Sequence, residues 1–282
     1  MCGIAGIFQS SDPGGDAVSA AAMAQAIAYR GPDAQGVMRR EDTWFSHRRL
    51  AIIDLSEAAN QPMTDAADGL MIVFNGEIYN FRELRMELES RGARFRTRGD
   101  TEVILELFAR DGIDGLARLD GMFALAIYVR RSRELYLMRD RLGKKPLFYF
   151  RTGDTVVFAS ELAALKRHPA WRGGLRPEAI HDFLAYEYVP DPDTVYEAVW
   201  KLPPGSWARF RTDAEPEIRR YWQPDFRDKL KINFEDAQAE LRALLSRAVS
   251  RRLIADVPCG IFLSGGMRSE EHTSELQSLA YL

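Results

Sequence analysis

Short apolar runs, separated by Gly, Pro and Asp, fill most of the first two hundred residues. This pattern is typical of β-strands joined by tight turns. The strands that it predicts are residues 3–8, 44–54, 70–75, 122–129, 134–139, 147–151, 156–160 and 206–210.

Apolar residues three or four apart predict amphipathic helices at residues 18–29, 81–90 and 101–110. Gly92 and Gly112 are expected to end the second and third of these helices. Strands joined by tight turns favour antiparallel sheets, and one-sided helices must cover them. We therefore expect an α+β fold in which two antiparallel sheets lie between helices.

The pattern changes after the polar stretch 211–220, which indicates a boundary between two units. Residues 234–253 predict a helix with one apolar side, and residues 257–263 predict a buried strand that includes Cys259. We expect this apolar side to stay uncovered, which predicts aggregation or fraying at the helix. Proteolysis near residues 211–235 would test this expectation.

Composition and charge exclude several classes of protein. Of the 282 residues, 46% are hydrophobic, which is typical of a globular protein. The 38 basic and 41 acidic residues give a net charge of −3, so neither nucleic acid nor an anionic membrane is an expected partner. No apolar run approaches the roughly 20 residues of a membrane span. The first eight residues lack Lys and Arg, which argues against a secretory signal and for the cytoplasm. The two cysteines and four histidines lack the paired spacing of a zinc site, so no metal is expected.

Cys2 is the first candidate for chemistry. Small Gly3 favours removal of Met1, which would leave Cys2 with a free α-amine. An α-amine has a pKa near 7.7–8.0, so it can serve as the base for the thiol of its own residue. By position alone, a cysteine that merely packs into the first strand is about equally favoured.

Motifs along the chain decide between these two interpretations. They are Cys2-Gly3-Ile4-Ala5-Gly6, Arg30-Gly31-Pro32-Asp33, residues 47–54, Asn75-Gly76-Glu77-Ile78-Tyr79-Asn80, Gly99-Asp100-Thr101-Glu102, and residues 119–124, 139–147 and 158–161. Together they resemble the glutaminase domain of class II glutamine amidotransferases. The resemblance is closest to the glutamine-hydrolysing asparagine synthetases and covers roughly residues 2–267.

The resemblance implies a four-layer αββα sandwich of the N-terminal nucleophile hydrolase type. It implies a glutaminase domain at residues 2–212 and the incomplete beginning of an ATP-pyrophosphatase-type synthetase domain at 213–267. Cys2 would be the nucleophile, and the Asn75 amide with the Gly76 N–H would form the oxyanion hole. Taken alone, Asn75-Gly76 is more typical of a hairpin turn with positive φ.

The resemblance also implies how glutamine would be held. Arg49, rather than its neighbour Arg48, would bind the α-carboxylate, and Glu77 and Asp100 would bind the α-ammonium. Asp100 also fits the N-cap of the helix that follows it. The backbone of four residues would lie along the bound substrate: Leu50, Ala51, Ile52 and Ile53.

Two further groups of residues within these motifs are not expected to take part in catalysis. His47 is expected to be a packed or surface histidine without a catalytic role, since the base is the α-amine. The run Lys144-Lys145-Pro146 is expected to form a turn that shapes the fold.

Residues 257–267 resemble the strand and phosphate loop that open the synthetase domain. By that resemblance ATP would be held, in an incomplete site, at Leu263, Ser264, Gly265 and Gly266. Arg268 stands where the family has an acidic residue, so we expect no synthetase chemistry from this chain. Residues 268–278 resemble the translation of a sequencing adapter, so residues 268–282 are expected to be a non-native tail; a genuine divergent C-terminus is the alternative.

The expected reaction is hydrolysis of L-glutamine to glutamate and ammonia through a Cys2 thioester, without a cofactor. The intact parent would be an asparagine synthase that uses ATP and Mg²⁺ to amidate aspartate, and the resemblance further implies a homodimer. One alternative is an amidotransferase of the same family that acts on another carboxylate, in a secondary-metabolite or cell-surface pathway. The other is a fragment that binds glutamine without turnover.

Overall fold

Two six-stranded antiparallel sheets form the centre of the molecule. The computed structural model describes residues 1–9 and 13–260. The first sheet has the strand order β10-β8-β9-β1-β3-β2 and the second β12-β11-β7-β6-β5-β4. The strands are β1 (Gly3–Phe8), β2 (Ala34–Arg40), β3 (Thr43–Arg49), β4 (Met63–Thr64), β5 (Leu70–Ile78), β6 (Gly121–Val129), β7 (Glu134–Arg139), β8 (Phe148–Thr152), β9 (Thr155–Ala159), β10 (Trp200–Lys201), β11 (Ser206–Phe210) and β12 (Glu217–Arg220).

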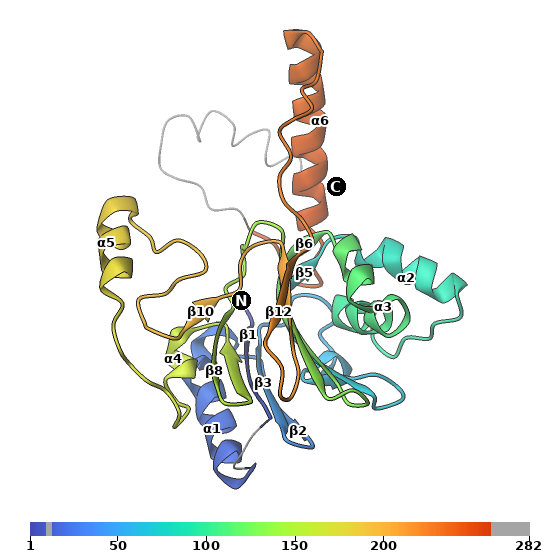
Figure 1. Ribbon diagram of the computed structural model, residues 1–282. Coiled ribbons are helices and arrows are strands. Elements are labelled where there is room, and N and C mark those ends of the chain that lie inside the picture. Colours follow the sequence, from blue (N-terminus) through green and yellow to red (C-terminus); the bar gives the residue numbers. More distant parts are fainter. Residues whose placement is uncertain (10–12, 261–282) are drawn as a thin grey trace.

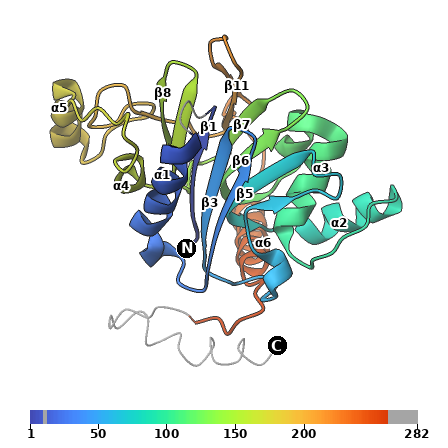
Figure 2. The same cartoon turned by 90° about the horizontal axis from the view of Figure 1, so that it is seen from below.

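Helices cover the outer face of each sheet, which gives four layers (Figures 1 and 2). On the first sheet lie α1 and α4, and on the second lie α2 and α3. Beyond them α5 and α6 project from the sandwich (Figure 1). The helices are α1 (Pro13–Ala26), α2 (Phe81–Ser90), α3 (Asp100–Gly115), α4 (Leu162–Leu165), α5 (Pro177–Tyr186) and α6 (Phe234–Arg252).

Three apolar clusters fill the spaces between these layers. The central cluster joins the inner faces of the two sheets and includes Ile4, Phe45, Val73 and Tyr128. The outer clusters join each sheet to its helices. A central strand is therefore buried on both faces, which explains why all six residues of β1 are buried and why the strand reads as a continuous apolar run.

The predicted α+β sandwich is confirmed, and several predicted boundaries are confirmed with it. Strands β1, β7 and β11 and helix α2 have the predicted limits. Gly92, at φ +87°, follows the end of α2, and Gly112, at φ +66°, interrupts the helical backbone of α3, although α3 continues to Gly115.

Other predicted boundaries are wrong. The strand predicted over 44–54 ends at Arg49, and the strand predicted to end at Asn75 continues to Ile78. The first helix begins at Pro13 rather than at residue 18. Strand β2 and helix α5 were not predicted, because polar residues alternate along β2 and most of α5 is exposed. Part of the polar stretch 211–220 is β12, which pairs with β11; the domain boundary at residue 212 stays a prediction.

The end of the described chain also differs from expectation. Residues 257–260 form no strand, and Cys259 is exposed rather than buried, because no strand of either sheet pairs with this segment. Leu263, Ser264, Gly265 and Gly266 lie outside the described residues. No helix within residues 1–9 and 13–260 is long and apolar enough to cross a membrane.

Helix α6 confirms the predicted open apolar side. Its N-cap is Asn233, whose Oδ1 accepts the Asp236 N–H at 2.8 Å. None of its residues is buried, and Leu241, Leu244 and Leu245 are each about half exposed.

Limited trypsin digestion is expected to cut first within residues 223–233. This segment is exposed and has no helix or strand, and Arg227, Lys229 and Lys231 lie in it. Mass spectrometry of the early products should show a resistant N-terminal fragment that ends at one of these residues. A first cut inside the sandwich would contradict this assignment.

Candidate active site

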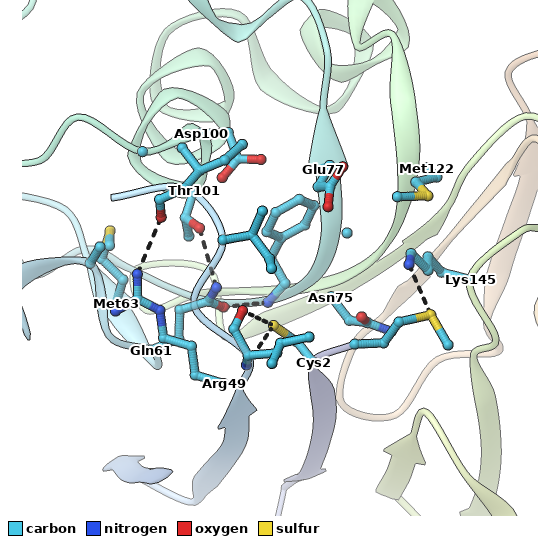
Figure 3. A pocket seen from close by; sticks show the side chains of 18 of the residues that line it. Cys2, Arg49, Gln61, Met63, Asn75, Glu77, Asp100, Thr101, Met122 and Lys145 are labelled. Atoms are coloured by element: carbon cyan, nitrogen blue, oxygen red, sulfur yellow. Dashed lines mark hydrogen bonds between the residues drawn. The ribbon is translucent and has the colours of Figure 1, made fainter. Parts of the chain in front are cut away.

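A cavity of about 280 Å³ opens where β1 begins (Figure 3). Its walls come from the N-terminus, the loop after β3, β4, the end of β5, the start of α3, the start of β6 and the segment after β7. Of the residues expected in the site, Cys2, Arg49, Asn75, Glu77 and Asp100 all line this cavity. Leu50, Ile52, Ile53 and Gly76 line it too.

The Cys2 thiol lies at the floor of the cavity, against the loop after β3. The Leu50 N–H donates to its sulfur at 3.4 Å, and the thiol donates to the Leu50 carbonyl at 3.6 Å. Burial raises the pKa of this thiol above its ordinary value. The Cys2 carbonyl accepts Arg30 Nε at 2.9 Å, so the residue is fixed on both sides.

Asn75 has a buried side-chain amide without a hydrogen-bond partner among residues 1–9 and 13–260. The residue is 1% exposed, and within that described part of the chain neither Nδ2 nor Oδ1 makes a hydrogen bond. A buried amide without a partner costs roughly 1–3 kcal/mol, so such groups are rare in proteins. In a cavity that also holds a thiol, a free amide N–H is a donor available to a bound molecule.

The Asn75-Gly76 pair is not a hairpin turn. Both residues lie inside β5, opposite Ala124 and Phe123 of β6. A Cβ at position 76 would stand 2.2 Å from the Met122 carbonyl oxygen, so only glycine allows β6 to approach this closely.

Arg49 organises the loop that follows it. Its Nη1 donates to Ser56 O at 2.9 Å and to Asn60 Oδ1 at 2.8 Å, and its Nη2 donates to the Ile53 and Asp54 carbonyls. These contacts turn the chain back on itself, which is why the predicted strand stops at Arg49. Arg48 points away and bonds to the Ala24 carbonyl and Gln25.

Two carboxyl groups lie across the cavity from the sulfur (Figure 3). Burial raises the pKa of Glu77, and burial raises the pKa of Asp100 to about 6. The expected N-cap role of Asp100 is wrong: α3 begins at Asp100 with Gly99 as N-cap, and the carboxylate instead accepts the Ile78 N–H at 3.0 Å. This bond joins the start of α3 to the end of β5.

Ala51 is the one expected substrate residue that does not line the cavity. Its N–H donates to Asp33 Oδ2 at 2.8 Å, on the outer side of the loop.

His47 is a packed histidine, as expected. It is 1% exposed, its Nε2 lies 3.2 Å from the Phe74 carbonyl, and burial lowers its pKa to about 3. It is therefore neutral near pH 7.

Sequence reasoning missed several residues of the cavity wall. Gln61 accepts the Phe74 N–H at 2.6 Å and donates to Thr101 Oγ1 at 3.2 Å, which links three segments. Met63 and Met122 add apolar surface. Met122 lies in the motif 119–124, whereas no local pattern in the sequence identifies Gln61 or Met63, because each enters the wall through a contact with a distant segment. Among the described residues, no group of three or more His, Cys, Asp or Glu could hold a metal ion.

Lys145 does more than shape the turn that the run Lys144-Lys145-Pro146 predicts. Its side chain lines the cavity, is 5% exposed, and donates from Nζ to Met1 Sδ at 3.2 Å (Figure 3). Burial lowers the pKa of this ammonium, while the nearby charge of Glu77 opposes the shift. The cavity therefore contains a buried cation near the thiol.

Comparison with known proteins gives two family matches. A family described as "Glutamine amidotransferase domain" matches residues 1–222, and one described as "Asparagine synthase" matches residues 240–269. The expected resemblance is thereby confirmed.

Among curated relatives, "Asparagine synthetase [glutamine-hydrolyzing] 1" of Bacillus subtilis is 35% identical over 95% of this chain and 43% of the relative. A putative asparagine synthetase of Mycobacterium tuberculosis H37Rv is 37% identical over 95% of this chain and 44% of the relative. This chain thus spans less than half the length of these two relatives.

Among solved structures, a glutamine phosphoribosylpyrophosphate amidotransferase from B. subtilis superposes with a TM-score of 0.58 at 20% identity. The superposition covers 79% of this chain and 50% of the amidotransferase chain. This likeness supports the fold alone.

Replacing Lys145 by Met is expected to shift alkylation of Cys2 to higher pH. The thiolate would lose the attraction of a buried cation, so more base would be needed to form it. The measurement is iodoacetamide labelling against pH, read by mass spectrometry. Exposed Cys259 serves as the internal reference, and Lys144→Met, at the exposed neighbouring lysine, is the matched control. An unchanged profile for Cys2 would show that Lys145 does not act on the thiol.

Proposed function

This chain belongs to the glutamine amidotransferase family, and from that premise we propose that it hydrolyses glutamine to glutamate and ammonia at Cys2. The observation that carries the proposal is the free, buried Asn75 amide in the cavity that holds the Cys2 thiol. A cysteine that only packed into β1 would not require an unpaired donor beside it.

The proposed reaction begins after removal of Met1. The α-amine of Cys2 takes the thiol proton, and the thiolate attacks the side-chain carbonyl carbon of glutamine. The C–N bond then breaks, the nitrogen leaves as ammonia with the proton from the α-ammonium, and a thioester remains. Water hydrolyses the thioester, which releases glutamate and restores the thiol. No cofactor enters these steps.

Asn75 and Gly76 would stabilise the negative oxygen of the tetrahedral intermediate. The Asn75 amide is already desolvated and has no hydrogen-bond partner in the described part of the chain, so it needs no reorganisation when the charge develops. The neutral His47 lies behind this strand and bonds to Phe74. It is not in the cavity wall and has no part in the reaction.

The two ends of glutamine would be recognised by opposite charges. Arg49 would bind the α-carboxylate, with the loop residues Leu50, Ile52 and Ile53 along the substrate. Glu77 and Asp100 lie on the other side of the cavity and would bind the α-ammonium. The loop that Arg49 organises is therefore part of the glutamine site.

The activity of a longer parent is a further proposal. The match of residues 240–269 to the "Asparagine synthase" family and the names of the relatives support ATP-dependent amidation of aspartate, with Mg²⁺, in such a parent. Amidation of another carboxylate is the alternative within the family. The homodimer and the cytoplasmic location stay predictions.

Replacing Cys2 by Ala should abolish release of glutamate from glutamine, and Asn75→Ala should lower kcat by about 10² to 10³. Cys259→Ala is the matched control and should keep full activity, because Cys259 is exposed and outside the cavity. The measurement is glutamate release by purified protein whose loss of Met1 has been verified by mass spectrometry. A wild-type protein that binds glutamine without turnover would support the non-catalytic alternative instead.

Acid should weaken glutamine binding through Asp100. As the pH falls below about 6, this carboxyl takes up a proton and no longer attracts the substrate ammonium, so KM should rise. The test is KM for glutamine measured between about pH 5 and pH 8. Asp100→Asn should have a raised KM at pH 7 and a smaller increase on acidification. Equal acid dependence in both proteins would assign the effect to another group.

A further inference from the structure

The end of α6 and the residues that follow it contact the glutaminase unit. Arg251 Nη1 donates to Asp120 Oδ2 at 2.8 Å, and the Arg252 guanidinium lies 4.7 Å from the centre of the Tyr79 ring. Ile254 packs against the core beneath α2 and α3. Residues 251–256, which include the last two residues of α6, thus contact this unit, although no residue of α6 is buried. We call residues 251–256 the docked segment.

Asp256 ends this docked segment with two hydrogen bonds to the loop after β3. Its Oδ2 accepts the Asp54 N–H at 2.7 Å, and its own N–H donates to the Ile52 carbonyl at 2.8 Å. More than two hundred positions of sequence separate the partners of the first bond. Ile52 is also a wall residue of the cavity, so these bonds hold the outer side of a loop whose inner side faces the proposed substrate.

The loop needs support from outside because its backbone is strained. Asp54 has φ +54°, the left-handed region that non-glycine residues seldom occupy. Its carboxylate accepts the N–H groups of Arg98 at 2.7 Å and Ser56 at 3.1 Å, while Arg49 binds the carbonyls from within. The Asp54 N–H itself has Asp256 as its acceptor, and Asp54 is 2% exposed.

We propose that Asp256 is a positioning residue that holds the loop 50–56 in its glutamine-binding shape. The carboxylate accepts a charge-assisted hydrogen bond from the one strained residue of the loop, and its backbone N–H adds a second bond. The docked segment 251–256 thereby links the part of the chain after residue 222 to the affinity of the first unit for glutamine. This inference rests on the proposed glutaminase function.

The test compares three variants of the full chain in glutamine hydrolysis. Asp256→Ala removes the acceptor and should raise KM for glutamine about fivefold while kcat stays within about twofold, because Cys2 and Asn75 are untouched. Asp256→Asn keeps an acceptor oxygen and should restore most of the affinity. Asp228→Ala, at an exposed aspartate of the linker, is the matched control and should behave as the wild type.

Amide hydrogen exchange gives a second readout that does not depend on activity. In Asp256→Ala, exchange should accelerate at residues 52–56 and stay unchanged in β1 and β6. If Asp256→Ala has the KM of the wild type and unchanged exchange, the proposal is wrong. Faster exchange throughout both sheets of this variant would also overturn it, because that result would indicate a general structural role. If the wild type shows no glutaminase activity, the proposed function fails, while the exchange data still decide whether Asp256 holds the loop.

Discussion

The packing of β1 against β5 across the interior of the sandwich is the constraint on which the site depends. Ile4 of β1 and Val73 of β5 belong to the same buried cluster between the sheets. This contact brings the first residues of the chain next to the middle of a strand more than seventy positions away. Cys2, which precedes β1, and Asn75, which lies within β5, therefore meet at one cavity.

The cavity keeps polar groups in states that folding alone would not favour. Among the described residues the Asn75 amide lacks a hydrogen-bond partner, Asp100 is desolvated, and the buried Lys145 ammonium donates a hydrogen bond to the Met1 thioether. Each of these costs stability. The three apolar clusters of the sandwich offset that cost, and a bound glutamine would provide the missing partners. Buried polar groups with shifted pKa values are typical of active sites.

Local patterns were sufficient for elements whose burial is uniform or strictly periodic. Strand β1 is apolar throughout because both of its faces are covered, and α2 has its apolar residues on one side. Patterns were insufficient where a long-range contact sets the backbone. The loop after Arg49 reads as a strand, yet the Arg49 guanidinium binds the carbonyls that follow it and closes a turn. Asn75-Gly76 has the composition of a hairpin turn, yet it continues β5 because β6 passes close beside it.

The sequence by itself determined the chemical groups of the site, since Cys2, Arg49, Asn75, Glu77 and Asp100 stand in motifs that can be recognised along the chain. The tertiary structure decided which further residues join them. Gln61 and Met63 enter the cavity wall, and Asp256 reaches the outer side of its loop, through contacts that no local spacing encodes. The physical reason is that a motif specifies which groups are present, whereas their burial, pairing and charge depend on the segments that fold against them.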